Sequence, residues 1–274
     1  MPTQTEKGKI FHALHHREGA FIIPNPWDAG SARLLASLGF EALASTSAGY
    51  AFSLGQRDNT VGRSAMMAHV AALVSATALP VSADLENGFG DAPETVAETI
   101  RLGAAAGLVG GSIEDATERP DDPIYERALA AERIRAAGEA ARALPFTFTL
   151  TARCENYLHG RPDLKDTIAR LQAYSQAGAD VLYAPGLTTK EDIAAVVSSV
   201  DKPVNVVMGL KGVQLRLAAL SELGVKRVSV GSALARAAYG AFFRAAREMR
   251  SEGTFTFADE AIPMREISAI FPVR

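Results

Sequence analysis

The chain has 274 residues, of which 48% are hydrophobic and 22% are charged, with a formal net charge of −3. This composition excludes a disordered chain, and the lack of a basic field or a local lysine and arginine cluster argues against a nucleic-acid partner. No stretch reaches the roughly 18 uninterrupted apolar residues of a membrane helix, and no signal-peptide core is present, so we expect a cytoplasmic protein without a membrane partner.

Short apolar runs alternate with longer segments of helical periodicity, which is the pattern of parallel βα units. We predict eight strands, at residues 21–24, 42–45, 81–83, 108–113, 146–152, 181–184, 204–207 and 227–230. Glycines at helix ends supply the turn into several strands: Gly39, Gly107, Gly178 and Gly224. Eight such units predict a single (β/α)₈ barrel of the TIM type. A doubly wound open sheet is the alternative, because periodicity does not report closure.

No linker divides the chain, so we expect one barrel domain over residues 1–274. Residues 254–274 follow the eighth predicted helix and contain Pro263 and Pro272. We expect this segment to be a C-terminal extension that packs on the barrel or on a neighbouring molecule.

Polar residues gather where the predicted strands end, and in a barrel these ends share one face. They are Asn25 after strand one, Ser45, Thr46 and Ser47 after strand two, Asp84 and Glu86 after strand three, Glu114 and Asp115 after strand four, Arg153 and Glu155 after strand five, and Asn205 on strand seven. Asp58 lies on the long loop after strand two. We expect all of them at one mouth.

The segment ADLENGFG, residues 83–90, places two carboxylates two positions apart. In an extended segment Asp84 and Glu86 lie on one face, about 6 to 7 Å apart, which requires a cation, a shared proton or solvent. With Glu114 and Asp58 nearby, and neither histidine nor cysteine at ligand spacing, the pattern suits Mg²⁺ or Mn²⁺ rather than zinc. An isolated pair of this kind is more often a solvated strand end.

Arg153 offers a planar fork for a carboxylate, and the turn Ser45–Thr46–Ser47 offers hydroxyl and backbone N–H groups to the same kind of anion. The alternative for Arg153 is a structural ion pair with Glu155. Segment 228–234, VSVGSAL, resembles a phosphate-binding turn, although a tight Gly-Ser turn explains it equally well.

Other candidate groups have simpler explanations. We expect the single cysteine, Cys154, to be a buried small hydrophobe rather than a nucleophile. Four histidines on predicted helices are expected to be surface or packing residues: His12, His15, His16 and His69. His159 lies beyond strand five, within reach of a substrate.

Taken together, these segments resemble the isocitrate lyase and phosphoenolpyruvate mutase superfamily over nearly the whole chain. The resemblance rests on NPWDAGSARLLASLGFEALASTSAGYA, Asp58, ADLENGFGDAPETV, GGSIEDAT, TARCENYL, GADVLYAPGL, KPVNVVMG and VKRVSVGSAL. It implies that Mg²⁺ is held, directly or through water, by Asp84, Glu86 and Glu114, with Asp58 behind them. It also implies that a substrate carboxylate is held by Ser45, Thr46, Ser47 and Arg153, and that Asn205 faces the site.

Two departures from the family pattern concern the substrate. Residues 116–126 read ATERPDDPIYE, whereas isocitrate lyases carry a K-[KR]-C-G-H loop and the mutase a lysine and an asparagine. Arg119 is the only cation in this loop. Glu86 replaces the family's usual second aspartate.

The resemblance implies a Mg²⁺-dependent lyase that cleaves a C–C bond of a small α-keto acid or 2-hydroxy diacid through an enolpyruvate-type intermediate. Oxaloacetate decarboxylase and methylisocitrate lyase chemistry are examples. Asp58, Glu114 and Arg153 are the predicted catalytic residues. The alternatives are a P–C bond enzyme, meaning a phosphonomutase or phosphonopyruvate hydrolase, and a barrel that binds keto acids without turnover. Family resemblance also implies a homodimer or homotetramer in which helix 232–252 packs on a partner subunit.

Overall fold

A computed structural model of the chain describes residues 2–211, 213 and 215–271. Ten strands occur in it: β1 (Phe21–Ile23), β2 (Leu43–Ala44), β3 (Val81–Asp84), β4 (Gly110–Glu114), β5 (Ala116–Arg119), β6 (Asp122–Ile124), β7 (Thr149–Arg153), β8 (Val181–Tyr183), β9 (Val204–Val207) and β10 (Arg227–Ser229). The α-helices are α1 (Gln4–His16), α2 (Ala29–Ser37), α3 (Ser47–Ser53), α4 (Arg63–Ala76), α5 (Pro93–Ala105), α6 (Arg127–Arg142), α7 (Leu164–Gln176), α8 (Lys190–Ser199), α9 (Leu217–Glu222), α10 (Ala233–Ser251) and α11 (Met264–Ile270). Two short 3₁₀ helices, η1 (Asn156–His159) and η2 (Thr256–Glu260), complete the described elements.

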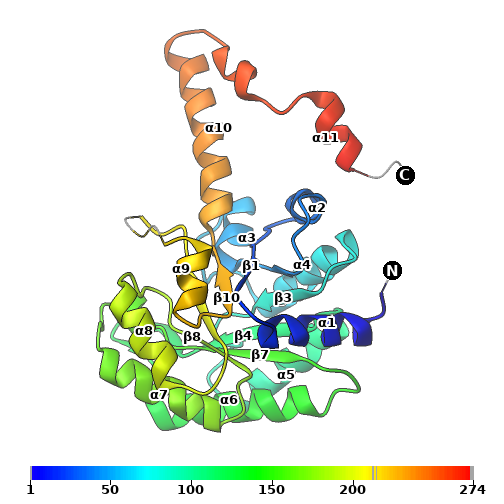
Figure 1. Cartoon of the computed structure of the whole chain (residues 1–274). Coiled ribbons are helices and arrows are strands. Elements are labelled where there is room, and N and C mark those ends of the chain that lie inside the picture. Colours follow the sequence, from blue (N-terminus) through cyan, green and yellow to red (C-terminus); the bar gives the residue numbers. More distant parts are fainter. Residues whose placement is uncertain (1, 212, 214, 272–274) are drawn as a thin grey trace.

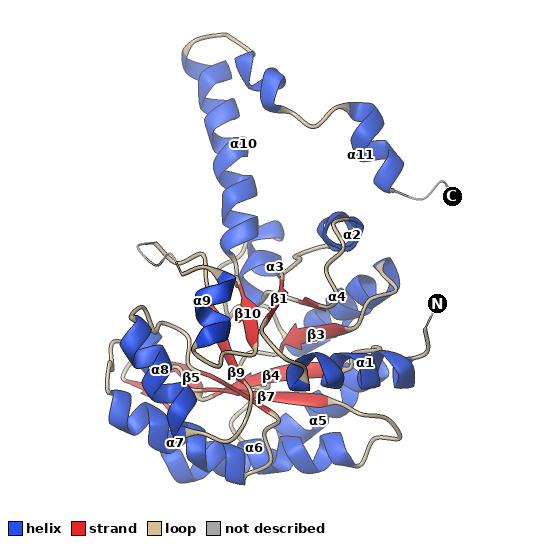
Figure 2. Ribbon diagram, in the orientation of Figure 1, coloured by secondary structure: helices blue, strands red, loops and turns tan. Residues whose placement is uncertain are grey.

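Eight of the strands form one parallel sheet in the order β1-β10-β9-β8-β7-β4-β3-β2, with helices outside it (Figures 1 and 2). The first and last strands of this order are joined by a hydrogen bond from Ala44 N to Pro24 O, 3.1 Å long. The sheet therefore curves back on itself. The predicted (β/α)₈ barrel is confirmed, and the alternative of an open doubly wound sheet is wrong.

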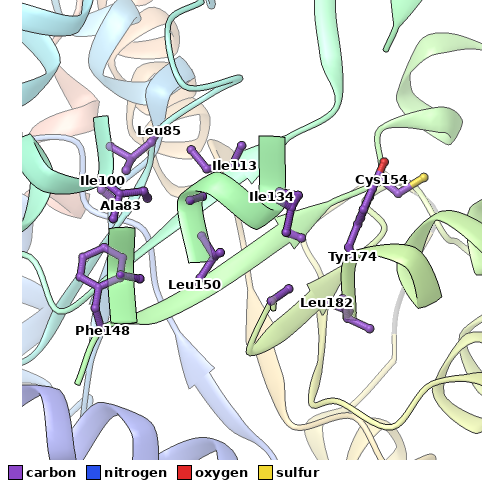
Figure 3. Packing of buried hydrophobic residues seen from close by; sticks show 14 of the residues in the cluster. Ala83, Leu85, Ile100, Ile113, Ile134, Phe148, Leu150, Cys154, Tyr174 and Leu182 are labelled. Carbon is purple, nitrogen blue, oxygen red and sulfur yellow. The ribbon is translucent and has the colours of Figure 1, made fainter. Parts of the chain in front are cut away.

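Alternate residues of each strand face the helices and the barrel interior. On β7, Leu150 and Ala152 face the helices and join the main hydrophobic core. Figure 3 shows such side chains from the strands together with Ile100 of α5 and Ile134 of α6. The inward positions are instead rich in buried polar side chains, among them Ser82, Thr149, Thr151, Asn205, Arg227 and Ser229. This interior therefore resembles a binding site more than an apolar core.

Helix α1 covers the N-terminal end of the barrel. Its Phe11 is fully buried and lies against Gly110 of β4, where an added Cβ would come within 2.7 Å of the Phe11 ring. The glycine thus allows the ring to fill the end of the barrel. The four predicted helix-end glycines all have positive φ, between +84° and +105°, which confirms their predicted role.

The loop at residues 116–126 forms an antiparallel hairpin, β5 and β6, beside the barrel mouth. Its Arg119 makes a 3.0 Å ion pair with Asp91, and the Tyr125 hydroxyl donates to the same carboxylate. The hairpin is therefore attached to the loop before α5.

Helix α10 extends away from the barrel, and the following chain turns back so that α11 lies above α2 (Figure 1). Ala235 is the only described residue of α10 that is buried, whereas Phe242 and Phe243 are 67% and 59% exposed. The expected packing of the extension on the barrel is seen where α11 contacts α2. Pro272 lies outside the described residues. In the part of the chain that is described, no helix is both long and apolar enough to cross a bilayer.

Candidate active site

A cavity of about 280 Å³ lies at the C-terminal ends of the strands. It is lined by side chains from the ends of all eight barrel strands, including Asn25, Ser45, Asp84, Glu114, Arg153, Tyr183, Asn205 and Ser229. Most of the polar strand ends predicted from the sequence therefore do meet at one mouth, but Glu86 and Asp115, also expected there, do not line this cavity. The volume suits a small acid.

Arg153, the last residue of β7, lies at the centre of a group of carboxylates. Its Nε is 2.8 Å from Glu155 Oε1, and its Nη1 is 2.8 Å from Asp84 Oδ1. Its Nη2 is 3.0 Å from Glu114 Oε2. We call the four cavity-lining acids, Asp58, Asp84, Glu114 and Glu155, the acidic wall. The ion pair with Glu155 expected as the alternative role is present, but it is one of three.

Burial and mutual attraction set the charges in this group. Burial alone would lower the pKa of Arg153, but Glu114, Glu155 and Asp84 together raise it well above its ordinary value. Burial also raises the pKa of Glu114 well above its ordinary value, although Arg153 opposes the shift. The guanidinium is thus permanently charged, and it faces more carboxyl groups than one positive charge keeps ionised.

The turn after β2 binds its neighbours through its own hydroxyls. Ser45 Oγ accepts from Asp84 N, and Thr46 Oγ1 accepts from Gly49 N as the N-cap of α3. The Ser47 hydroxyl lies 3.0 Å from Asp58 Oδ1 and 2.9 Å from Asp84 Oδ2. A hydroxyl has one proton, so it satisfies one of these carboxylates at a time.

The acids fit a metal ion that is bound largely through water. Burial, followed by the charge of Asp84, raises the pKa of Asp58, so a cation beside these two groups would relieve their repulsion. Within the described ranges, however, no three histidine, cysteine, aspartate or glutamate residues are placed to bind one ion directly. Hydrated Mg²⁺, which keeps several of its waters, matches this arrangement.

Glu86 departs from the geometry expected of an extended strand. Strand β3 ends at Asp84, and Glu86 has a φ of +50°, which breaks the alternation of side chains. Its carboxylate lines a neighbouring pocket together with Glu118 of the hairpin. Glu86 is 4% exposed, and its Oε1 has no hydrogen-bond partner among the described residues. Burial, and then Asp84, raise its pKa to about 9.

Asn25 ties the two edges of the barrel mouth together. Its Oδ1 accepts from the N–H groups of Val230 and Gly231, and its Nδ2 donates to Ser45 O. Two of the backbone donors that a phosphate would need in segment 228–234, those of Val230 and Gly231, are therefore already used, which favours the simple tight turn.

Asp115, next to Glu114, holds the site from behind. It accepts from Glu155 N at 2.7 Å and from the Tyr174 hydroxyl at 2.6 Å, and it pairs with Arg170 at 3.2 Å. Cys154 is fully buried in the hydrophobic core, as expected. These groups fix the strand end that carries Arg153.

Two polar side chains of the cavity stand before the strand ends, on the barrel interior: Asn205, the second residue of β9, and Arg227, the first residue of β10, which we call the cavity floor. Arg227 Nε donates to Asn205 Oδ1 at 2.9 Å, and Asn205 Nδ2 donates to Ser229 Oγ at 3.0 Å. Arg227 was not among the predicted site residues. The alternation of Arg227 and Ser229 with the apolar Val228 could have indicated this role, because alternate residues of a strand share a face and Arg227 and Ser229 both face inward.

Two further side chains at the cavity, Tyr183 and Arg236, were not assigned a role from the sequence, and His159 lies there with them. The Tyr183 ring lies 5.4 Å from the Arg153 guanidinium, and burial raises the pKa of its hydroxyl to about 12. It is therefore a neutral donor at physiological pH. His159 does reach the cavity, as the sequence suggested it could.

The family model described as phosphoenolpyruvate phosphomutase matches residues 11–250 of the chain. The chain belongs to this family. A crystal structure of a Burkholderia cenocepacia J2315 protein is 70% identical and has a TM-score of 0.95, with 97% of this chain and 95% of that chain covered. The 2-methylisocitrate lyase of Halalkalibacterium halodurans is 27% identical and covers 92% of this chain and 85% of its own.

A third similar protein has ligands at its site. The crystal structure of a phosphonopyruvate hydrolase in complex with oxalate and Mg²⁺ is 25% identical, with a TM-score of 0.85, and covers 96% of this chain and 94% of its own. Other similar proteins are named 2,3-dimethylmalate lyase and oxaloacetate acetylhydrolase. The predicted membership of a superfamily of lyases and mutases is thereby confirmed.

Proposed function

We propose that the protein is a Mg²⁺-dependent lyase that cleaves a C–C bond next to a keto or carboxylate group of a small α-keto acid or 2-hydroxy diacid. The observation that carries the proposal is Arg153, which lies on the cavity wall and ion-pairs with Asp84 and Glu114. An arginine among hydrated-metal ligands suits a substrate that presents a carboxylate and a keto oxygen side by side.

Cleavage of such a bond leaves an electron pair that is delocalised onto an enolate oxygen. When bound beside Asp84 and Glu114, with Glu86 behind Asp84 in the neighbouring pocket, Mg²⁺ would supply a compensating positive charge there. Arg153 would hold the substrate carboxylate by two parallel N–H bonds, together with the Ser45–Ser47 turn and Asn205. Asp58 would accept or return a proton, for which its raised pKa is suited.

Cleavage of a P–C bond is the second candidate, because the matching family is described as phosphoenolpyruvate phosphomutase. The same enolate forms when the P–C bond of a phosphonate breaks and its phosphoryl group is transferred to an acceptor such as water. The hairpin at residues 116–126 lacks both known forms of the family's loop, so it does not favour either leaving group.

The test is a ligand panel of oxaloacetate, 2-oxoglutarate and phosphonopyruvate in Mg²⁺, with pyruvate, CO₂ and phosphate measured as products. We expect pyruvate without phosphate, and loss of turnover in EDTA and in Asp84→Asn. Glu98→Gln, an exposed acid on α5, is the matched control and should keep full activity. Phosphate release would favour the P–C candidate. Binding without any product would show a keto-acid-binding barrel and overturn the proposal.

We further propose that the chain forms a homodimer or homotetramer through α10. The support is the row of exposed apolar side chains on a helix that extends beyond the barrel, including Phe242, Phe243 and Met249. Light scattering at micromolar concentration should give a mass at least twice 28.9 kDa. Replacement of both phenylalanines by glutamate should give the monomer mass, and a wild-type monomer would contradict the proposal.

A further inference from the structure

The floor of the cavity contains a buried arginine without a carboxylate. Arg227 is 5% exposed, and in the described part of the chain no aspartate or glutamate lies within ion-pairing distance of it. Buried charges in proteins are normally paired, because removing a charge from water is costly. An unpaired guanidinium at the base of a cavity therefore needs an explanation.

Each side-chain nitrogen of Arg227 has a hydrogen-bond partner, and all three partners are neutral. Its Nη2 donates to Thr151 Oγ1 at 3.0 Å, and its Nη1 lies 3.2 Å from His15 Nε2. His15 Nδ1 lies 2.8 Å from the carbonyl of Phe11, which only accepts, so Nδ1 carries the proton and Nε2 is the acceptor for Arg227. Burial, followed by the charge of Arg227, lowers the pKa of His15 well below its ordinary value and keeps it neutral.

The arginine remains charged even so. Burial lowers the pKa of Arg227 to about 10, which still leaves it protonated at physiological pH. The Arg227 guanidinium is thus hydrogen-bonded by neutral groups, and none of them carries a negative charge that would compensate its own.

Arg227 also fixes the orientation of Asn205. A guanidinium only donates, so the Asn205 oxygen must face it, and the amide NH₂ faces Ser229 and the cavity. A half-turn of the amide would direct its NH₂ at the guanidinium. Asn205 therefore presents an N–H donor, backed by a positive charge, to whatever oxygen reaches the floor.

We propose that Arg227 is a positioning residue that fixes Asn205 as a donor and reserves the positive charge of the floor for an anionic oxygen of the ligand. The inference rests on the proposed function, in that the ligand is a small acid bound in this cavity. Arg227 acts through Asn205 and through its field rather than by direct attack or proton transfer.

The decisive substitution is Asn205→Asp, which changes one atom and supplies the missing carboxylate. Ser229 is able to donate to the new oxygen, so the shape of the floor is kept. The melting temperature should rise by about 2 to 4 °C, as for a gain near 1 kcal/mol in a chain of this size. Affinity for oxalate with Mg²⁺, measured by calorimetry, should fall about tenfold or more, because the floor no longer carries free positive charge.

The control is the same substitution at another buried asparagine. Asn156 donates to Asp166 and Thr167, so Asn156→Asp places two carboxylates together and should lower the melting temperature. If Asn205→Asp lowers it as well, Arg227 is not an unbalanced charge and the inference is wrong.

Substitutions of Arg227 separate positioning from simple structural support. Arg227→Gln should weaken oxalate binding about tenfold or more, whereas Arg227→Lys, which keeps the charge, should recover most of the affinity. Equal binding by wild type and Arg227→Gln would overturn the inference and leave the proposed function standing. If the wild type binds neither oxalate nor any keto acid of the panel, the proposed function fails, and the melting temperatures of the two aspartate variants alone decide the inference.

Discussion

Two arginines that line one cavity have opposite surroundings. Arg153 contacts three carboxyl groups of the acidic wall, whereas the partners of Arg227 among the described residues are a histidine, a threonine and an asparagine. The wall thus gathers four carboxyl groups around one guanidinium, and the floor holds a positive charge without a carboxylate. The difference shows that the cavity is polarised along its depth, with a side for cations and a side for anions.

The largest effect is expected when the centre of the acidic wall is removed. Arg153→Met leaves the carboxyl groups of Asp84, Glu114 and Glu155 without their counter-charge, so the free energy of unfolding at pH 7 should fall by about 3 to 5 kcal/mol. Urea denaturation measures it, and Arg161→Met, an exposed arginine nearby, should change it by less than about 0.5 kcal/mol. If the free energy of unfolding fell by less than about 1 kcal/mol, the acidic wall would not depend on Arg153 as its counter-charge, and the proposed difference between wall and floor would be wrong.

A smaller effect is expected when the guanidinium of Arg153 is replaced by the ammonium of a lysine. Arg153→Lys keeps the charge but loses the fork that binds a carboxylate in two places. The catalytic efficiency on the accepted keto acid should fall by about 10- to 150-fold, as for the loss of one charged hydrogen bond of roughly 1.5 to 3 kcal/mol. Steady-state kinetics test this prediction, and full efficiency in the lysine variant would leave Arg153 a structural role only.

The smallest effect concerns the pH dependence of stability without metal. The folded pKa of Glu86, about 9, lies above the ordinary value of 4.5, so its stabilising contribution is present below pH 4.5 and lost as the pH rises towards 9. In EDTA, Glu86→Gln should therefore be more stable than wild type at pH 8, by about 1 to 3 kcal/mol, and nearly equal at pH 4.5. An unchanged difference across this range would show that Glu86 is solvated.

The sequence predicted the barrel and its mouth because strand ends and helix-end glycines are local signals. Asp84, Glu114 and Arg153 came together because parallel strands end on one face. The direction of Glu86 could not be predicted, since its positive φ arises after the strand has ended. Thr46 illustrates a different limit, because a hydroxyl that appears free in the sequence is used to cap α3.

The floor was missed for a physical reason. Arg227 lies in a short strand next to Lys226, and two consecutive basic residues in a sequence are usually predicted to be exposed to solvent. Its partner His15 is 212 residues away and was expected to be a surface or packing residue. Only the closure of the barrel over α1 brings the two together.

Helix α10 connects the cavity to a place far from the barrel. Its first turns carry Arg236, which lines the cavity, and the helix continues for roughly 28 Å in all, at 1.5 Å per residue. A partner subunit bound at the outer end by the contact proposed above would therefore act on the same helix that carries Arg236 at the cavity. If that contact forms, protein concentration becomes a variable in any rate measured on this chain.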